Sequence, residues 1–140
     1  MASHLFKRNE ITKLAKKILA MQPDIIAMAG PLGAGKTTLT KAIAKELGIN
    51  DVVVSPTFIL HRDYPGLDHI DAWRAEDFSE IKNLGLAKMI AKKHLIIIEW
   101  ADKFEFEIRN LKLENRVIWV KIEYAEKENE RSISYEDIGS

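Results

Sequence analysis

The spacing of apolar residues along the chain predicts an alternation of helices and strands. Apolar residues recur at helical spacing between Ile11 and Leu19, with lysines on the opposite face, which indicates an amphipathic helix. The runs at 25–29 and 95–98 are apolar throughout, as is typical of strands buried in a parallel sheet. The same reasoning predicts helices over 38–47, 75–83 and 86–93, and strands over 52–54, 57–61, 67–72, 117–124 and 132–135.

Two turns predict antiparallel strand pairs. The turn Tyr64-Pro65-Gly66 separates the strands at 57–61 and 67–72, so these two strands are expected to form a hairpin. The charged stretch 126–131 is expected to turn the chain, so that its last strand returns beside the strand at 117–124. We allow for disorder in the last few residues.

Composition narrows the class of protein. The chain has 140 residues, with 21 Lys and Arg against 21 Asp and Glu, so its balanced charge indicates neither a nucleic-acid coat nor a polybasic membrane surface. The absence of cysteine excludes disulfides, thiolate zinc sites and a cysteine nucleophile. No apolar stretch approaches the roughly 18 residues of a membrane span, and no secretory h-region is present. The default expectation is a soluble, cytoplasmic protein.

The most informative motif joins the strand at 25–29 to the helix at 38–47. The segment from Gly30 to Thr37 reads G-P-L-G-A-G-K-T, which matches the phosphate-binding pattern G-x-x-x-x-G-K-T. In this pattern backbone N–H groups surround a polyphosphate, the lysine reaches the outer phosphates and the threonine hydroxyl ligates Mg²⁺. The expected phosphate-binding residues are Gly33, Ala34, Gly35, Lys36, Thr37 and Thr38.

This P-loop and the order of elements together predict the fold. Strands that alternate with helices around a buried apolar strand form an α/β structure. We therefore expect residues 1–140 to form one domain, a P-loop NTPase-like three-layer sandwich with central parallel strands and antiparallel edge strands.

Acidic residues at strand ends are candidates for the metal side of the site. Glu99 follows four aliphatic residues, so it is expected at the carboxyl edge of the sheet, where it either holds the metal through water or acts as a general base. His69 and Asp71 are two apart on a strand and share a face, so Asp71 could approach Mg²⁺ with His69 orienting it or the phosphates. Taken alone, the triplet is better explained by a structural His–Asp pair. Thr57, in Ser-Pro-Thr, is a candidate for a nucleotide-sensing loop, and a simple strand-entry turn is the alternative.

Taken together, these motifs resemble the TsaE (YjeE) family, small P-loop ATPases of bacterial tRNA threonylcarbamoyladenosine synthesis. Besides the P-loop, the family's S-P-T-[FY] segment appears at 55–58, its H-x-D-x-[YW]-R at 69–74, and its apolar strand ending in E-W at 96–100. Two departures stand out: Pro31 replaces the family's usual Asp, and the match weakens from Ala101 onward.

The resemblance implies that the chain binds ATP or ADP with Mg²⁺ and that its partners are TsaD-like and TsaB-like proteins. It implies contact with tRNA only indirectly, through that complex. In that family TsaD transfers the threonylcarbamoyl group, and ATP turnover supports or resets the complex. The resemblance also implies that Thr37, Asp71 and Glu99 serve the metal, that Thr57 lies in the nucleotide-responsive loop, and that Trp100 lies beside the nucleotide. We expect Lys36, Asp71 and Glu99 to be the catalytic residues.

Two other classes of nucleotide-binding protein, GTPase-like switches and small-molecule kinases, share part of this sequence pattern. Residues 63–66 fit the D-x-x-G of a GTPase-like switch, but no guanine-reading N-K-x-D sequence occurs. A small-molecule kinase usually closes an arginine-bearing lid over the phosphates, and the lid-sized segment 101–113 carries Arg109 alone.

Overall fold

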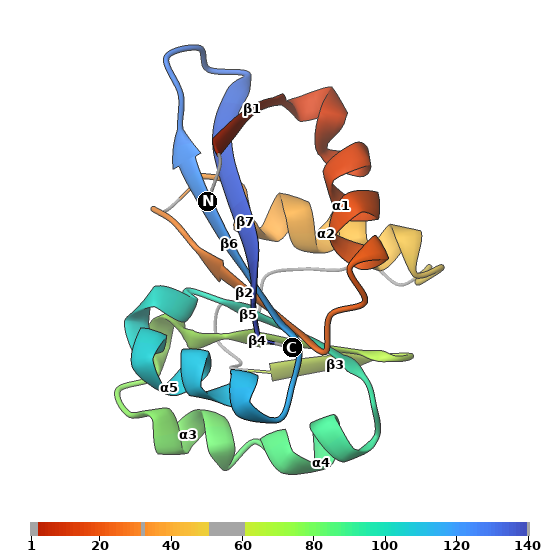
Figure 1. The fold of residues 1–140 in the computed structure, drawn as a ribbon, viewed down its shortest axis with the longest axis vertical. Coiled ribbons are helices and arrows are strands. Elements are labelled where there is room, and N and C mark those ends of the chain that lie inside the picture. The colour runs from red at the N-terminus through yellow and green to blue at the C-terminus, as the bar shows by residue number, and fades with distance from the viewer. Residues whose placement is uncertain (1–2, 32, 51–60, 140) are drawn as a thin grey trace.

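The computed structural model describes residues 3–31, 33–50 and 61–139, and these form one mixed sheet with helices on both faces (Figure 1). Within this part of the chain the strand order is β1-β7-β6-β2-β5-β4-β3. The strands are β1 (Ser3–Lys7), β2 (Ile25–Ala29), β3 (His61–Tyr64), β4 (Leu67–Asp71), β5 (Leu95–Glu99), β6 (Val117–Tyr124) and β7 (Glu130–Gly139).

The centre of the sheet is parallel and its two sides are antiparallel, which confirms the predicted arrangement. Strands β4, β5, β2 and β6 run in the same direction, whereas β7 and β1 on one side and β3 on the other are antiparallel to their neighbours. All five residues of β2 are buried, because helices cover both faces of this part of the sheet. The carboxyl ends of the parallel strands therefore meet at one edge.

The helices divide the core into two halves. Helices α1 (Ile11–Ala20) and α2 (Lys36–Glu46) cover one face, and α3 (Phe78–Lys82), α4 (Leu86–Ala91) and α5 (Glu105–Asn110) cover the other (Figure 1). Successive residues of β2 enter opposite halves: Ile26 and Met28 pack with α1 and α2, and Ile25 and Ala27 pack with α3 and α4. Short 3-10 turns lie at Arg8–Glu10, Ala72–Arg74, Ala101–Phe104 and Leu111–Leu113.

Several elements differ from the prediction. The helix expected over 75–83 is limited to α3, because Asp77 and Glu80 form a capping box that starts it at Phe78. Strand β1 and helix α5 were not predicted, since both segments are too short to show a clear hydrophobic period. Strand β7 extends to Gly139, four residues beyond the strand expected at 132–135.

The hairpin around Tyr64-Pro65-Gly66 is confirmed, because β3 and β4 pair antiparallel across it. Among the described residues its first strand covers His61–Tyr64, so it extends three residues past the predicted end at His61. The strand expected at 52–54 and the rest of the strand expected at 57–61 lie outside the described residues, as does Thr57.

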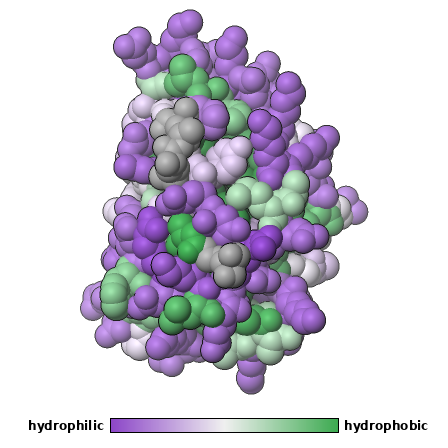
Figure 2. Space-filling view, viewed as in Figure 1, coloured by the Kyte–Doolittle hydropathy of each residue, from purple (hydrophilic) through white to green (hydrophobic). Residues whose placement is uncertain are grey.

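The outer surface is largely polar on the face shown in Figure 2, where hydrophobic residues appear in small separate groups. In the described parts of the chain, no helix combines the length and the apolar character that crossing a membrane requires.

The packing of the start of the P-loop against β6 can be tested by substitution. Gly30 has φ +148°, and a Cβ added there would lie 2.2 Å from the backbone oxygen of Ile122 on β6. We expect Gly30→Ala to lower the free energy of unfolding by more than about 2 kcal/mol, because both backbone strain and overlap with β6 oppose it.

The matched control is Gly66→Ala, at φ +77° with nothing within 4 Å of the added Cβ. This control should cost only the strain, about 1 kcal/mol. Urea unfolding of both variants measures the difference, and equal losses would contradict the proposed overlap with β6.

Candidate functional site

The P-loop lies between the end of β2 and the start of α2, where glycines give the backbone an open curve. Gly33 and Gly35 have φ of +77° and +118°, values that residues with a side chain rarely adopt. A Cβ added at Gly35 would meet nothing within 4 Å, so the space beside it is open. The N-cap residue of α2 is Gly35, which has no side chain to accept from the first N–H groups of the helix, so these groups can meet an anion.

Lys36 is folded back over its own loop. Its Nζ donates to the carbonyl oxygens of Gly30 at 2.6 Å and Pro31 at 2.9 Å, and lies 3.8 Å from the ring centroid of Trp100. Burial lowers the pKa of Lys36, and the negative charges of Glu99, Asp102 and Asp71 partly offset that effect. The ammonium is therefore held at the mouth of the loop by carbonyls and an aromatic face, close to where an outer phosphate would bind.

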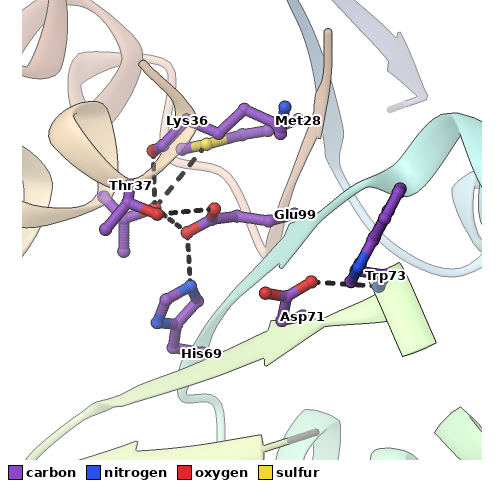
Figure 3. A network of polar contacts seen from close by, with 8 residues as sticks. Met28, Lys36, Thr37, His69, Asp71, Trp73 and Glu99 are labelled. Carbon is purple, nitrogen blue, oxygen red and sulfur yellow. Dashed lines mark hydrogen bonds and ion pairs between the residues drawn. The ribbon is translucent and has the colours of Figure 1, made fainter. Parts of the chain in front are cut away.

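Glu99 is the centre of a buried polar network (Figure 3). The Thr37 hydroxyl lies 2.9 Å from its Oε1, while the Thr40 hydroxyl lies 3.0 Å and His69 Nε2 lies 2.5 Å from its Oε2. The side chain of Glu99 is only 2% exposed and that of His69 is fully buried. Both carboxylate oxygens are thus fixed by donors from α2 and β4.

These contacts set the charge of Glu99. Burial opposes its ionisation, but the hydrogen bond and charge of His69, together with the hydrogen bonds from Thr37 and Thr40, outweigh that cost and lower its pKa. Glu99 is therefore ionised at neutral pH, as a group that serves a cation must be.

Asp71 lies next to Glu99 across the sheet. The two residues are register partners in the parallel pair β4–β5, and Figure 3 shows their carboxylates on the same side. Asp71 Oδ1 accepts a hydrogen bond of 2.9 Å from the backbone N–H of Trp73, and the residue is 7% exposed. The carboxyl edges of β4 and β5 therefore bring two acidic groups close to the P-loop threonine.

His69 does not form the structural pair with Asp71 that its position two residues away suggested. Its Nε2 contacts Glu99 on the next strand, and its Nδ1 is buried without a hydrogen-bond partner among the described residues. Thr40 was missed altogether, although it lies one helical turn after Thr37 and is fully buried. A buried threonine at that spacing was the signal available in the sequence.

Trp100 follows Glu99 in a left-handed backbone conformation, with φ +59°. Its ring lies against that of Trp73, with 4.5 Å between centroids, and beneath the Lys36 ammonium. Left-handed backbone is unfavourable for a bulky residue, so the surrounding contacts must hold it there. Trp100 thus forms one wall of the site.

Among the described residues, two hollows adjoin the P-loop. One is lined by Gly33, Gly35, Lys36, Thr37, Thr38, Glu99 and Trp100. The other lies between the N-terminal segment, the P-loop and the β6–β7 hairpin, with Phe6, Lys7, Ile11, Thr38, Asn129 and Arg131 among its lining residues. The sequence did not reveal the second hollow, because its walls come from both ends of the chain.

The donor set in the first hollow suits a hard cation. Hydroxyl and carboxylate oxygens are ligands that Mg²⁺ prefers. Thr37 and Glu99 supply them in the hollow, and Asp71 is the register partner of Glu99 on the next strand. Among the residues that the structure describes, however, no three His, Cys, Asp or Glu side chains are arranged to hold a metal by themselves. Such an edge fits a cation that takes its remaining ligands from phosphate oxygens and water.

Comparisons with known proteins agree on one family. Residues 5–133 match the family model described as "Threonylcarbamoyl adenosine biosynthesis protein TsaE". A Bacillus subtilis protein named tRNA threonylcarbamoyladenosine biosynthesis protein TsaE is 35% identical over 138 residues, covering 94% of this chain and 82% of the relative. The protein of the same name from Streptomyces coelicolor is 34% identical over 112 residues, covering 75% and 74%.

A solved structure is also similar. The crystal structure of Bacillus subtilis YdiB superposes with a TM-score of 0.71 and 27% sequence identity, covering 99% of this chain and 87% of that chain.

The ionised state of Glu99 leads to a pH-dependent prediction. Because its pKa in the fold lies below the ordinary 4.5, its ionisation stabilises the protein above that pH, and this contribution is lost as the pH falls through the lowered pKa. The stability difference between the wild type and Glu99→Gln should be largest at neutral pH and should narrow below about pH 4.5.

Urea unfolding across this pH range provides the measurement. Glu123→Gln, at a glutamate of β6 with a half-exposed side chain, serves as the control and should change stability little at any pH. A constant difference for Glu99→Gln would contradict the assigned charge.

Proposed function

The chain belongs to the TsaE family of tRNA threonylcarbamoyladenosine biosynthesis proteins, and from that premise we propose that it binds ATP with Mg²⁺ and hydrolyses it to ADP and phosphate. The observation that carries the proposal is the junction of the P-loop with Glu99, where Thr37 and Glu99 are hydrogen-bonded at 2.9 Å beside Lys36. In P-loop ATPases a threonine and a strand-end carboxylate stand at this point to serve the metal.

The phosphates would bind to the backbone N–H groups between Gly33 and Thr38. Lys36 would leave the carbonyls of Gly30 and Pro31 and turn its ammonium toward the outer phosphates. When bound, Mg²⁺ would neutralise charge that develops on the phosphate oxygens. Thr37 can offer its oxygen to the cation while its hydrogen stays with Glu99.

The two carboxylates would have different tasks. Both oxygens of Glu99 are engaged with fixed donors in a site that is nearly closed to solvent, which suits a group that orients Thr37 and metal-bound water. Asp71 is the neighbouring carboxylate on the same face, and we assign to it the orientation of the attacking water.

The second hollow would accept the nucleoside. It shares Gly33, Gly35 and Thr38 with the phosphate site and continues away from Glu99. Phe6 and Ile11 supply apolar walls that a flat base can lie against, and Asn129 supplies an amide that can hydrogen-bond to it. A nucleotide could thus span both hollows along the P-loop.

Two observations argue against the small-molecule kinase and the GTPase-like switch. The segment 101–113 is packed on the sheet, with Ile108 fully buried and Arg109 positioned over the ring of Trp119, so it does not serve as a phosphate lid. The D-x-x-G at 63–66 lies at the amino end of β4, whereas the P-loop lies at the carboxyl edge of the sheet.

We further propose that ATP turnover supports a cytoplasmic complex with TsaD-like and TsaB-like proteins. The balanced net charge of the chain does not indicate a nucleic-acid coat, and we propose that it meets tRNA through these partners.

Two substitutions should separate binding from turnover. Lys36→Ala should abolish ATP binding, because it removes the cation that faces the outer phosphates. Glu99→Ala should leave ADP binding within a few-fold of the wild type and lower hydrolysis by about 100-fold or more.

Calorimetric titrations with ADP and with a non-hydrolysable ATP analogue, together with a phosphate-release assay, provide these measurements. Lys45→Ala, at the exposed end of the same helix, is the control for loss of a lysine and should change neither quantity. Parental hydrolysis by Glu99→Ala would refute the role of this carboxylate.

The partner proposal has its own test. Phosphate release by the purified protein is compared with and without a TsaB–TsaD pair, with Lys36→Ala as the blank. Strong stimulation would support an ATPase subunit of the modification complex. Unchanged hydrolysis in the presence of the pair would contradict that role.

A further inference from the structure

The P-loop contacts the β6–β7 hairpin at several of its described residues, although this hairpin carries none of the family motifs quoted above. Gly30 lies against the backbone of Ile122, and a Cβ at Gly33 would lie 2.9 Å from the Tyr124 hydroxyl. Arg131 of β7 completes the contact, because its Nε donates to the Ala34 carbonyl at 3.0 Å. The hairpin therefore meets the first part of the loop, at Gly30, Gly33 and Ala34.

Arg131 binds three backbone carbonyls at once. Besides Ala34, its Nη1 donates to the carbonyls of Glu128 at 2.7 Å and Glu130 at 2.8 Å. Its guanidinium carbon lies 5.1 Å from the ring centroid of Tyr124, the residue nearest Gly33. Only a planar group with several fixed donors can make these bonds together, so lysine cannot replace it.

The second property of Arg131 is that its positive charge is not neutralised by an ion pair among the described residues. Within the described residues no carboxylate forms an ion pair with it, and its hydrogen-bond acceptors are neutral carbonyls. Arg131 lines the second hollow together with Gly35 and Thr38. A positive charge without a carboxylate partner thus stands on the wall of a pocket that continues from the phosphate site.

We propose that Arg131 is a positioning residue of the nucleotide site: it fixes the P-loop through the Ala34 carbonyl and adds its charge to the pocket that receives the nucleotide. This inference rests on the proposed nucleotide binding, and it assigns part of the site to the C-terminal hairpin. Loss of the guanidinium removes the donor to the Ala34 carbonyl and makes the loop more flexible. The N–H groups of residues 33–36 then no longer converge on one anion position.

The test uses the full chain with Arg131→Lys and Arg131→Gln. Arg131→Lys should weaken ADP binding about tenfold in calorimetric titration, the size expected for loss of one charge-assisted hydrogen bond, and Arg131→Gln should weaken it further because the charge is lost as well. Because Arg131→Lys keeps the charge, weaker ADP binding by this variant than by the wild type would show that the fixed geometry of the guanidinium is needed. Amide hydrogen exchange at residues 33–36 should become faster in both variants without nucleotide.

Arg116→Lys is the matched control. Arg116 also bonds a backbone carbonyl, that of Met21, and pairs with Asp137 of β7, but at the other end of β6. Its replacement should leave both ADP affinity and the exchange of residues 33–36 at wild-type values, even if the thermal midpoint falls as in Arg131→Lys.

Parental ADP affinity and parental P-loop exchange in both Arg131 variants would overturn the inference. If the wild type itself does not bind ADP, the proposed function fails. The exchange measurement then still decides the inference that Arg131 holds the loop.

Discussion

A buried carboxylate needs donors, and for Glu99 these come from two other elements of the fold. Thr37 and Thr40 belong to α2, and His69 belongs to β4. An uncompensated buried charge would cost several kcal/mol, so α2, β4 and β5 must keep their relative positions for the folded state to persist. The P-loop leads directly into α2, and its shape is therefore tied to the same carboxylate that faces the candidate metal position.

The other side of the loop is supported by a different kind of contact. There the chain packs backbone against backbone, with Gly30 on Ile122, and Arg131 bonds the Ala34 carbonyl. One support consists of residues within recognisable motifs, and the other belongs to a hairpin whose sequence carries none. The loop at 33–36 is held between these supports while the space beside Gly35 stays open. A preorganised anion site requires N–H donors that are fixed in position around an open space.

Patterns in the sequence predicted the features whose causes are local. The apolar runs at β2 and β5, the helical period of α1 and the glycine spacing of the P-loop each follow from a few neighbouring residues, and Glu99 could be placed at a strand end for the same reason. Features that depend on distant segments escaped: β1 is a strand because β7 lies beside it, and the second hollow needs both chain ends. His69 was assigned to the wrong carboxylate, since its partner lies 30 residues away on another strand.

The resting place of Lys36 makes ligand binding an exchange rather than an addition. The ammonium already has three neighbours of negative character, two carbonyls and the face of Trp100. On the proposed function, an incoming phosphate would compete with these neighbours for the ammonium. A lone phosphate would offer few contacts in return, whereas a chain of phosphates would also reach the N–H groups along the loop. The loop's own carbonyls would then favour polyphosphates over small single anions.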